Sequence, residues 1–169
     1  MSKAEVGIIM GSTSDLDIME EAARMLESFG IDYDMTISSG HRSPERTIAY
    51  ARSARDKGIK VIIVGAGGAA HLAGTIAALT TLPVIGVPIH SSPLGGLDAL
   101  LSTVQMPSGV AVATMAVGQA GAKNAAILAT QILALSNLDL EVKLAAHKEQ
   151  MEEEVARAAE ESLQSRPSS

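Results

Sequence analysis

The chain has 169 residues and a formal net charge of −6, and 47% of its residues are hydrophobic. This length is enough for one domain with a full core and too short for two, so we expect a single domain over residues 3–157. The chain has no cysteine, which excludes disulfides, thiolate nucleophiles and cysteine-based metal sites and is compatible with a cytoplasmic location. We expect no nucleic-acid partner, because the only basic concentration, residues 42–60, falls on one short predicted helix.

We also expect no membrane partner, although the middle of the chain is unusually apolar. Residues 61–122 contain a single charged residue, Asp98, so much of this stretch must be buried. Glycines and prolines divide its most apolar part, residues 61–89, into pieces too short to span a bilayer. The N-terminal apolar run is too short for a signal peptide.

Short runs rich in β-branched residues alternate with runs of helical periodicity along the chain. The predicted strands, most of them bounded by glycine, proline or serine, are residues 5–10, 31–37, 60–65, 83–87 and 109–113. The predicted helices are residues 15–29, 44–57, 70–80, 97–104 and 118–135. This alternation predicts an α/β protein with a parallel sheet, right-handed crossovers and helices on both faces.

A further helix is predicted from about residue 138, after the sheet is complete. One apolar stripe runs along it, formed by Leu140, Leu144, Met151 and Val155. Since little core remains unclaimed in the domain, we expect this stripe to pack on a neighbouring subunit. The polar residues 158–169 are expected to fray.

The first predicted strand is followed by the turn Gly11-Ser12-Thr13-Ser14-Asp15. Small residues let a ligand approach the backbone, hydroxyls donate hydrogen bonds and the following helix N-terminus favours an anion, which is typical of a phosphate cradle. A capped turn without a ligand also accounts for Ser14, which with Asp17 imitates a capping box. Ser12 and Thr13 then remain for a ligand.

The second predicted strand leads into Ser38-Ser39-Gly40-His41-Arg42-Ser43-Pro44. Ser43 can cap the next helix and Pro44 can open it, which places His41 on a strand-to-helix turn. Ligands of parallel α/β proteins bind at the carboxyl ends of the strands, so a histidine at this position is suited to proton transfer. Arg42 beside it offers a planar cation that suits a phosphate.

The third predicted strand is followed by a glycine-rich turn, residues 65–74. Gly65, Gly67 and Ala70 match the form G-x-G-x-x-A, but no acidic residue follows about 20 positions later to hold a ribose. We interpret the glycines instead as exposed backbone amides that approach a small anionic or planar group. His71 either lines that pocket or caps the chain locally, and both interpretations stay open.

The remaining histidines favour structural roles. His90 follows the fourth strand without flanking chemistry, and His147 lies on the C-terminal helix as a packing or surface residue. Neither stands at metal-ligand spacing from His41, so we expect no metal. One Phe, two Tyr and no Trp leave little aromatic surface for a flavin.

Taken together, these turns resemble those of the N5-carboxyaminoimidazole ribonucleotide mutase family of de novo purine synthesis, in its bacterial branch. The likeness runs from about residue 6 to residue 135 through several motifs in the same order. They are residues 10–15, 39–44, 65–74, 83–88, 96–98, 104–107 and 121–126.

The resemblance implies a flavodoxin-like three-layer α/β/α fold and a homo-octamer whose C-terminal helices exchange between subunits. It implies a cofactor-free isomerase that moves a carboxylate from the exocyclic nitrogen of an aminoimidazole ribonucleotide to ring carbon 4. His41 would be the general acid and base, and Ser12, Asp15 and Arg42 would hold the ribose 5-phosphate end. The same turns would supply further substrate contacts at Ser39, Gly40, Gly67, Gly68, Ala69, His71 and Leu72.

Two residues depart from the family pattern: Gly40 stands where alanine is usual, and Ala73 where proline is usual. The glycine should loosen the turn that carries His41. Two other functions also stay open on the residues alone. One is a carboxylase that adds free carbon dioxide to the unmodified aminoimidazole ribonucleotide, and the other is a non-catalytic nucleotide or flavin binder on the same fold.

Overall fold

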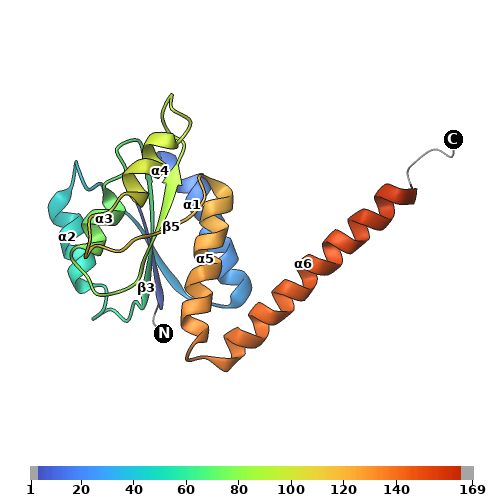
Figure 1. Ribbon diagram of the computed structural model, residues 1–169. Coiled ribbons are helices and arrows are strands. Elements are labelled where there is room, and N and C mark those ends of the chain that lie inside the picture. The colour runs from blue at the N-terminus through green and yellow to red at the C-terminus, as the bar shows by residue number, and fades with distance from the viewer. Residues whose placement is uncertain (1–3, 165–169) are drawn as a thin grey trace.

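The computed structural model describes residues 4–164 and contains one five-stranded sheet flanked by helices (Figure 1). The strands are β1 (Val6–Met10), β2 (Tyr33–Ile37), β3 (Val61–Gly67), β4 (Val84–Ile89) and β5 (Ala113–Thr114). They are all parallel and lie in the order β2-β1-β3-β4-β5. This is the flavodoxin-like order, so the predicted α/β three-layer class is confirmed.

Helices cover both faces of the sheet, because side chains alternate between the faces along each buried strand. In β1, Ile8 and Met10 join one core with the helices α1 (Leu16–Phe29) and α5 (Gln119–Ala134). Ile9 faces the other core. The helices of that second core are α2 (Pro44–Ser53), α3 (Leu72–Ala77) and α4 (Leu97–Val104).

The predicted element positions hold along most of the chain, with differences at some ends. The fifth strand covers only Ala113–Thr114 rather than residues 109–113. The chain first turns at Gly109, where φ is +94° and the Val110 amide donates to the Pro107 carbonyl, so pairing with β4 starts late. The third strand, by contrast, runs two residues further than predicted, to Gly67.

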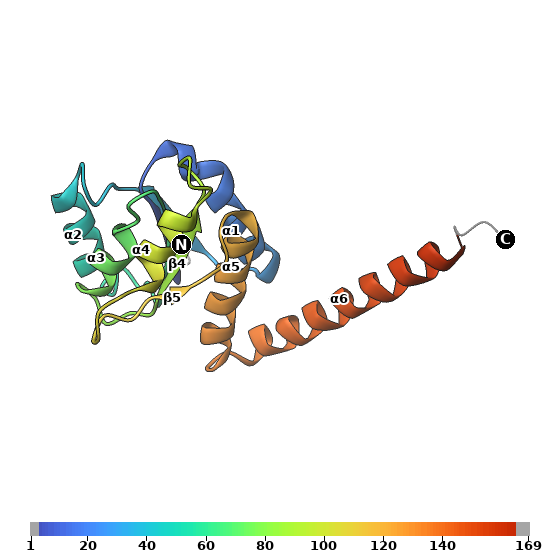
Figure 2. The same cartoon turned by 45° about the horizontal axis from the view of Figure 1, so that its top comes forward.

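The last helix, α6 (Leu138–Gln164), starts against its own domain and then leaves it (Figures 1 and 2). Leu140 and Leu144 pack into the core of α1 and α5. The Lys143 ammonium donates to the Phe29 carbonyl at 2.7 Å, and the His147 ring meets the Phe29 ring edge-on at 5.5 Å. Our expectation that this stripe had no place in its own domain is therefore wrong for its first turns.

The outer half of α6 has no cover in this chain, since Met151 is 47% and Val155 71% exposed. The helix also continues to Gln164, past residue 157, where we expected fraying to begin. The remainder of that expected tail, residues 165–169, lies outside the described residues. None of the described helices is long and apolar enough to cross a bilayer.

Candidate functional site

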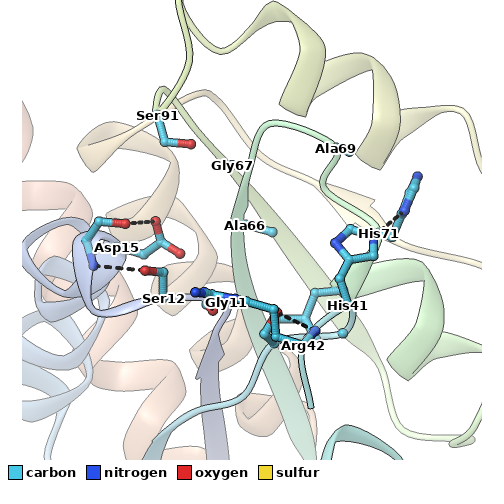
Figure 3. A pocket seen from close by; sticks show the side chains of 14 residues that line it. Gly11, Ser12, Asp15, His41, Arg42, Ala66, Gly67, Ala69, His71 and Ser91 are labelled. Atoms are coloured by element: carbon cyan, nitrogen blue, oxygen red, sulfur yellow. Dashed lines mark hydrogen bonds between the residues drawn. The ribbon is translucent and has the colours of Figure 1, made fainter. Parts of the chain in front are cut away.

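A cavity of about 280 Å³ lies at the carboxyl ends of β1 to β4, where the loops after these strands meet (Figure 3). This is the edge at which parallel α/β sheets bind ligands. The lining residues are Gly11, Ser12, Ser14, Asp15, Ser39, Gly40, His41, Arg42, Ala66, Gly67, Ala69, His71, Leu72 and Ser91. The structure thus brings together every predicted site residue except Gly68.

The first turn contains a short 3-10 helix, η1 (Thr13–Asp15), before α1 begins. Ser12, not Ser14, is the capping residue, because its Oγ accepts from the Ser14 amide at 3.4 Å. The predicted capping box with Ser14 is therefore wrong. The 3-10 turn displaces the start of α1 to Leu16 and leaves the Ser14 hydroxyl to donate to Asp15 Oδ1 at 3.3 Å.

Asp15 is almost fully buried beneath this turn, with 3% of its surface exposed. Burial raises the pKa of its carboxyl, because the charged form loses solvation. The Ser14 hydroxyl, the amides of Ser12 and Gly11 and the Arg42 charge oppose this shift. The charged form of this cavity-lining carboxyl is therefore destabilised by its burial.

The second turn fixes Arg42 across the cavity. The Arg42 amide donates to Ser39 Oγ at 3.1 Å, and its guanidinium Nη2 donates to the Gly11 carbonyl at 3.2 Å. Pro44 opens α2 as predicted, but Ser43 does not cap it. The Ser43 hydroxyl instead accepts from the Ser39 amide and donates to the Ser39 carbonyl, both at 3.0 Å, because the turn folds back on itself.

His41 and His71 lie next to each other in the cavity lining, joined by a hydrogen bond (Figure 3). His41 Nε2 and His71 Nδ1 are 2.7 Å apart, and the two rings meet edge-on with centroids 4.9 Å apart. Such a bond needs one nitrogen with a proton and one without, so the bonded pair holds at most one positive charge. His71 occupies the N-cap position of α3 without a side-chain capping bond. Of its two open interpretations, lining the pocket is the one the structure supports.

The glycine-rich turn differs from its prediction. Gly65 lies inside β3, where an added Cβ would come within 2.8 Å of Met19 Cγ, so it is packed beneath α1 and exposes no amide to a ligand. Gly68 adopts a φ of +58° but does not line the cavity. Gly67, Ala69 and Leu72 do line it.

Sequence reasoning missed Ser91, which reaches the cavity from the end of β4. The available signal was its place after a predicted strand, the same signal that drew attention to His90. His90 itself lies outside the cavity lining, close to Gly118 and Gly96. Within the described residues, no three His, Asp or Glu side chains are grouped as metal ligands would be.

Comparison with known proteins agrees with this architecture. The family model described as AIR carboxylase matches residues 5–154. The N5-carboxyaminoimidazole ribonucleotide mutase of Pyrococcus horikoshii is 57% identical over 93% of this chain and 88% of its own length. The Bacillus subtilis protein of the same name is 52% identical over 92% and 96%.

A solved structure gives the same picture. The crystal structure of Treponema denticola PurE superposes with a TM-score of 0.84 at 28% identity, covering 94% of this chain and 98% of that one. The chain therefore belongs to the AIR carboxylase family.

Proposed function

We propose that this protein is an isomerase of de novo purine synthesis that converts N5-carboxyaminoimidazole ribonucleotide to 4-carboxy-5-aminoimidazole ribonucleotide. The observation that carries the proposal is the shared cavity of His41, Arg42 and the turn after β3. A proton-transfer group and an anion-binding group there suit a phosphorylated substrate whose carboxylate moves with the help of two proton transfers. Relatives between 52% and 57% identical that carry the mutase name support this assignment.

The proposed binding residues form two ends of the cavity, and each end binds a different part of the substrate. Ser12, Asp15 and Arg42 hold the ribose 5-phosphate, with the Arg42 guanidinium already fixed against the Gly11 carbonyl. Gly67, Ala69 and Leu72 enclose the carboxylate that moves, while Ser39 and Gly40 shape the turn between the two ends.

His41 carries the protons in this proposal. It donates a proton to the exocyclic nitrogen, the bond from that nitrogen to the carboxylate breaks, and carbon dioxide is released. Ring carbon 4 then attacks carbon dioxide, and His41 removes the proton that this carbon carried. The protons balance without a cofactor, and the turn after β3 keeps carbon dioxide in the site.

His71 supports this cycle by holding the His41 ring in position. Because His41 Nε2 bonds His71 Nδ1 at 2.7 Å before substrate enters, the substrate must displace or share that bond. The bond therefore limits the rotation of the His41 ring.

The test offers the protein two substrates at low enzyme concentration. One reaction contains N5-carboxyaminoimidazole ribonucleotide without ATP, and the other contains aminoimidazole ribonucleotide with bicarbonate. We expect the 4-carboxylate to form faster from the first. The family description of AIR carboxylase favours direct carboxylation as the second candidate, and faster product formation from the second mixture would establish it instead.

The role of His41 is tested by His41→Asn with His90→Asn as the matched control. The first replacement should lower kcat by about 100-fold or more, while the nucleotide still binds. The second removes a histidine that lies outside the cavity lining and should leave kcat unchanged. Substantial turnover by His41→Asn would refute the assigned role.

The protein is further proposed to act as a cytoplasmic homo-octamer. Leu135, directly after α5, is 88% exposed and Leu138, the first residue of α6, is 75% exposed, and a partner subunit would cover them. Light scattering should give eight times the chain mass, and a monomer would contradict this assembly. Fractionation of cells should recover the protein with the cytoplasm, and recovery elsewhere would contradict the location.

A further inference from the structure

Ser91 enters the cavity from the loop after β4, and none of the predicted site residues comes from that loop. It follows β4, and its amide donates to the Ile89 carbonyl at 3.0 Å, which closes a tight turn at the strand end. This bond fixes the backbone from which the hydroxyl projects. The side chain therefore has a defined position at the cavity wall (Figure 3).

The neighbouring strand makes room for Ser91. A Cβ on Gly67 would lie 2.8 Å from Ser91 Cβ, closer than real Cβ atoms come, and 3.1 Å from the Ile89 carbonyl oxygen, which is also an unusually tight contact. Gly67 does not adopt a positive φ, so the glycine here provides space rather than an unusual backbone conformation. The Ser91 side chain thus lies directly over the end of β3.

The other hydroxyls of the cavity each already make at least one hydrogen bond within the protein. Ser12 Oγ accepts from the Ser14 amide, Ser14 Oγ donates to Asp15, and Ser39 Oγ accepts from the Arg42 amide. Among residues 4–164, no partner bonds the Ser91 hydroxyl, although it lines the same cavity. Ser12 and Ser39 act only as acceptors in these bonds and keep their O–H groups for a ligand, whereas the Ser91 hydroxyl has both its donor and its acceptor capacity available.

Its place in the cavity decides which part of a ligand it meets. In Figure 3, Ser91 lies apart from His41 and His71, with Gly67 and Ala66 between them. A hydroxyl so far from the histidine pair is placed for binding and not for proton transfer. The turn with Asp15 and Ser12 lies on the same side of Gly67 as Ser91.

We infer that the Ser91 hydroxyl hydrogen-bonds the sugar-phosphate half of the ribonucleotide and is a specificity-determining residue for it. The inference rests on the proposed function, because it takes the ligand to be a ribose 5-phosphate derivative. A hydroxyl can donate to a phosphate oxygen and also accept from a ribose hydroxyl, so it matches this half of the substrate.

The test compares Ser91→Ala with Ser92→Ala, whose hydroxyl accepts from the Leu94 amide outside the cavity lining. Loss of one hydrogen bond should raise the KM of Ser91→Ala by about threefold to tenfold and leave kcat within about twofold. Calorimetry should show ribose 5-phosphate binding weakened by the same factor. Ser92→Ala should match the wild type in all three measurements.

Other results would overturn the inference. If Ser91 only supports the turn after β3, Ser91→Ala will lower kcat and the melting temperature while ribose 5-phosphate binds as tightly as before. If the wild-type protein turns over neither ribonucleotide, the proposed function fails, and the calorimetric comparison still decides the role of Ser91. Wild-type protein that does not bind ribose 5-phosphate would refute both.

Discussion

Replacing Gly40 with alanine should stabilise the protein without harming its site. Gly40 does not adopt a positive φ, and an added Cβ would lie 3.6 Å from Leu72 Cδ1 and 3.8 Å from Leu72 Cα. Those are ordinary van der Waals distances, so alanine fits the folded turn as it stands. The gain then comes from the unfolded chain, which loses conformational entropy worth about 0.4–1 kcal/mol.

For a domain of this length, that gain corresponds to a rise in melting temperature of about 1–4 °C. Thermal unfolding followed by circular dichroism measures it, with both proteins at one concentration because subunit association also shifts the midpoint. The kcat should stay within about twofold of the wild type, since the added methyl group meets Leu72 at ordinary contact distance and does not displace it.

Gly109→Ala is the matched control, because it adds the same methyl group where no atom lies within 4 Å but φ is +94°. Backbone strain should lower stability there by about 1–2 kcal/mol. A fall in melting temperature for Gly40→Ala would refute the reasoning, since it would mean that the turn carrying His41 requires glycine.

Two further predictions concern buried groups. Burial raises the pKa of Asp15, so the folded state binds its proton more tightly than the unfolded state and stability falls as pH rises through this range. Asp15→Asn removes that cost, so the variant should have a higher melting temperature than the wild type at pH 7 and should bind substrate more weakly. The difference in melting temperature should shrink toward pH 4. A difference that stays constant across this pH range would contradict the prediction. The Tyr50 hydroxyl is buried without a partner among the described residues and sits where a Cβ on Gly7 would be. Tyr50→Phe should stabilise by about 1 kcal/mol and Gly7→Ala should destabilise by about 1–3 kcal/mol. The double variant should recover most of the stability that Gly7→Ala loses, because Tyr50 Cζ, the next atom of that side chain, lies 3.4 Å from the added Cβ. Denaturant unfolding of the wild type, the two single variants and the double variant measures the coupling between the two positions. Additive effects of the two substitutions would exclude such coupling.

The amino-acid sequence by itself determined the sheet and the edge at which the site forms. Strand and helix periodicities are local, so alternation along the chain is enough to predict a parallel sheet. A parallel sheet brings the carboxyl ends of its strands to one edge, so the turns containing Ser12, His41 and Ala69 had to meet. Pro44 marked the start of α2 because a proline ring is compatible with the first helical turn.

Only the tertiary structure decided what the side chains in those turns touch. Gly65 looked like part of an open loop, but Met19 of another helix packs over it. His41 and His71 are 30 residues apart and nothing local predicts that their rings bond at 2.7 Å. Ser91 became part of the site because Gly67 leaves room for it.

The same limit applies to the C-terminal helix. Its apolar stripe was evident from periodicity, but composition did not reveal that Leu140 and Leu144 pack against a surface near Phe29. Val155, on the same stripe, remains exposed. An apolar stripe indicates that one face of a helix packs against another surface. Which surface it packs against depends on what remains exposed after the other elements have packed. Local sequence pattern therefore set the elements and their order, and packing between distant segments set the contacts that determine function.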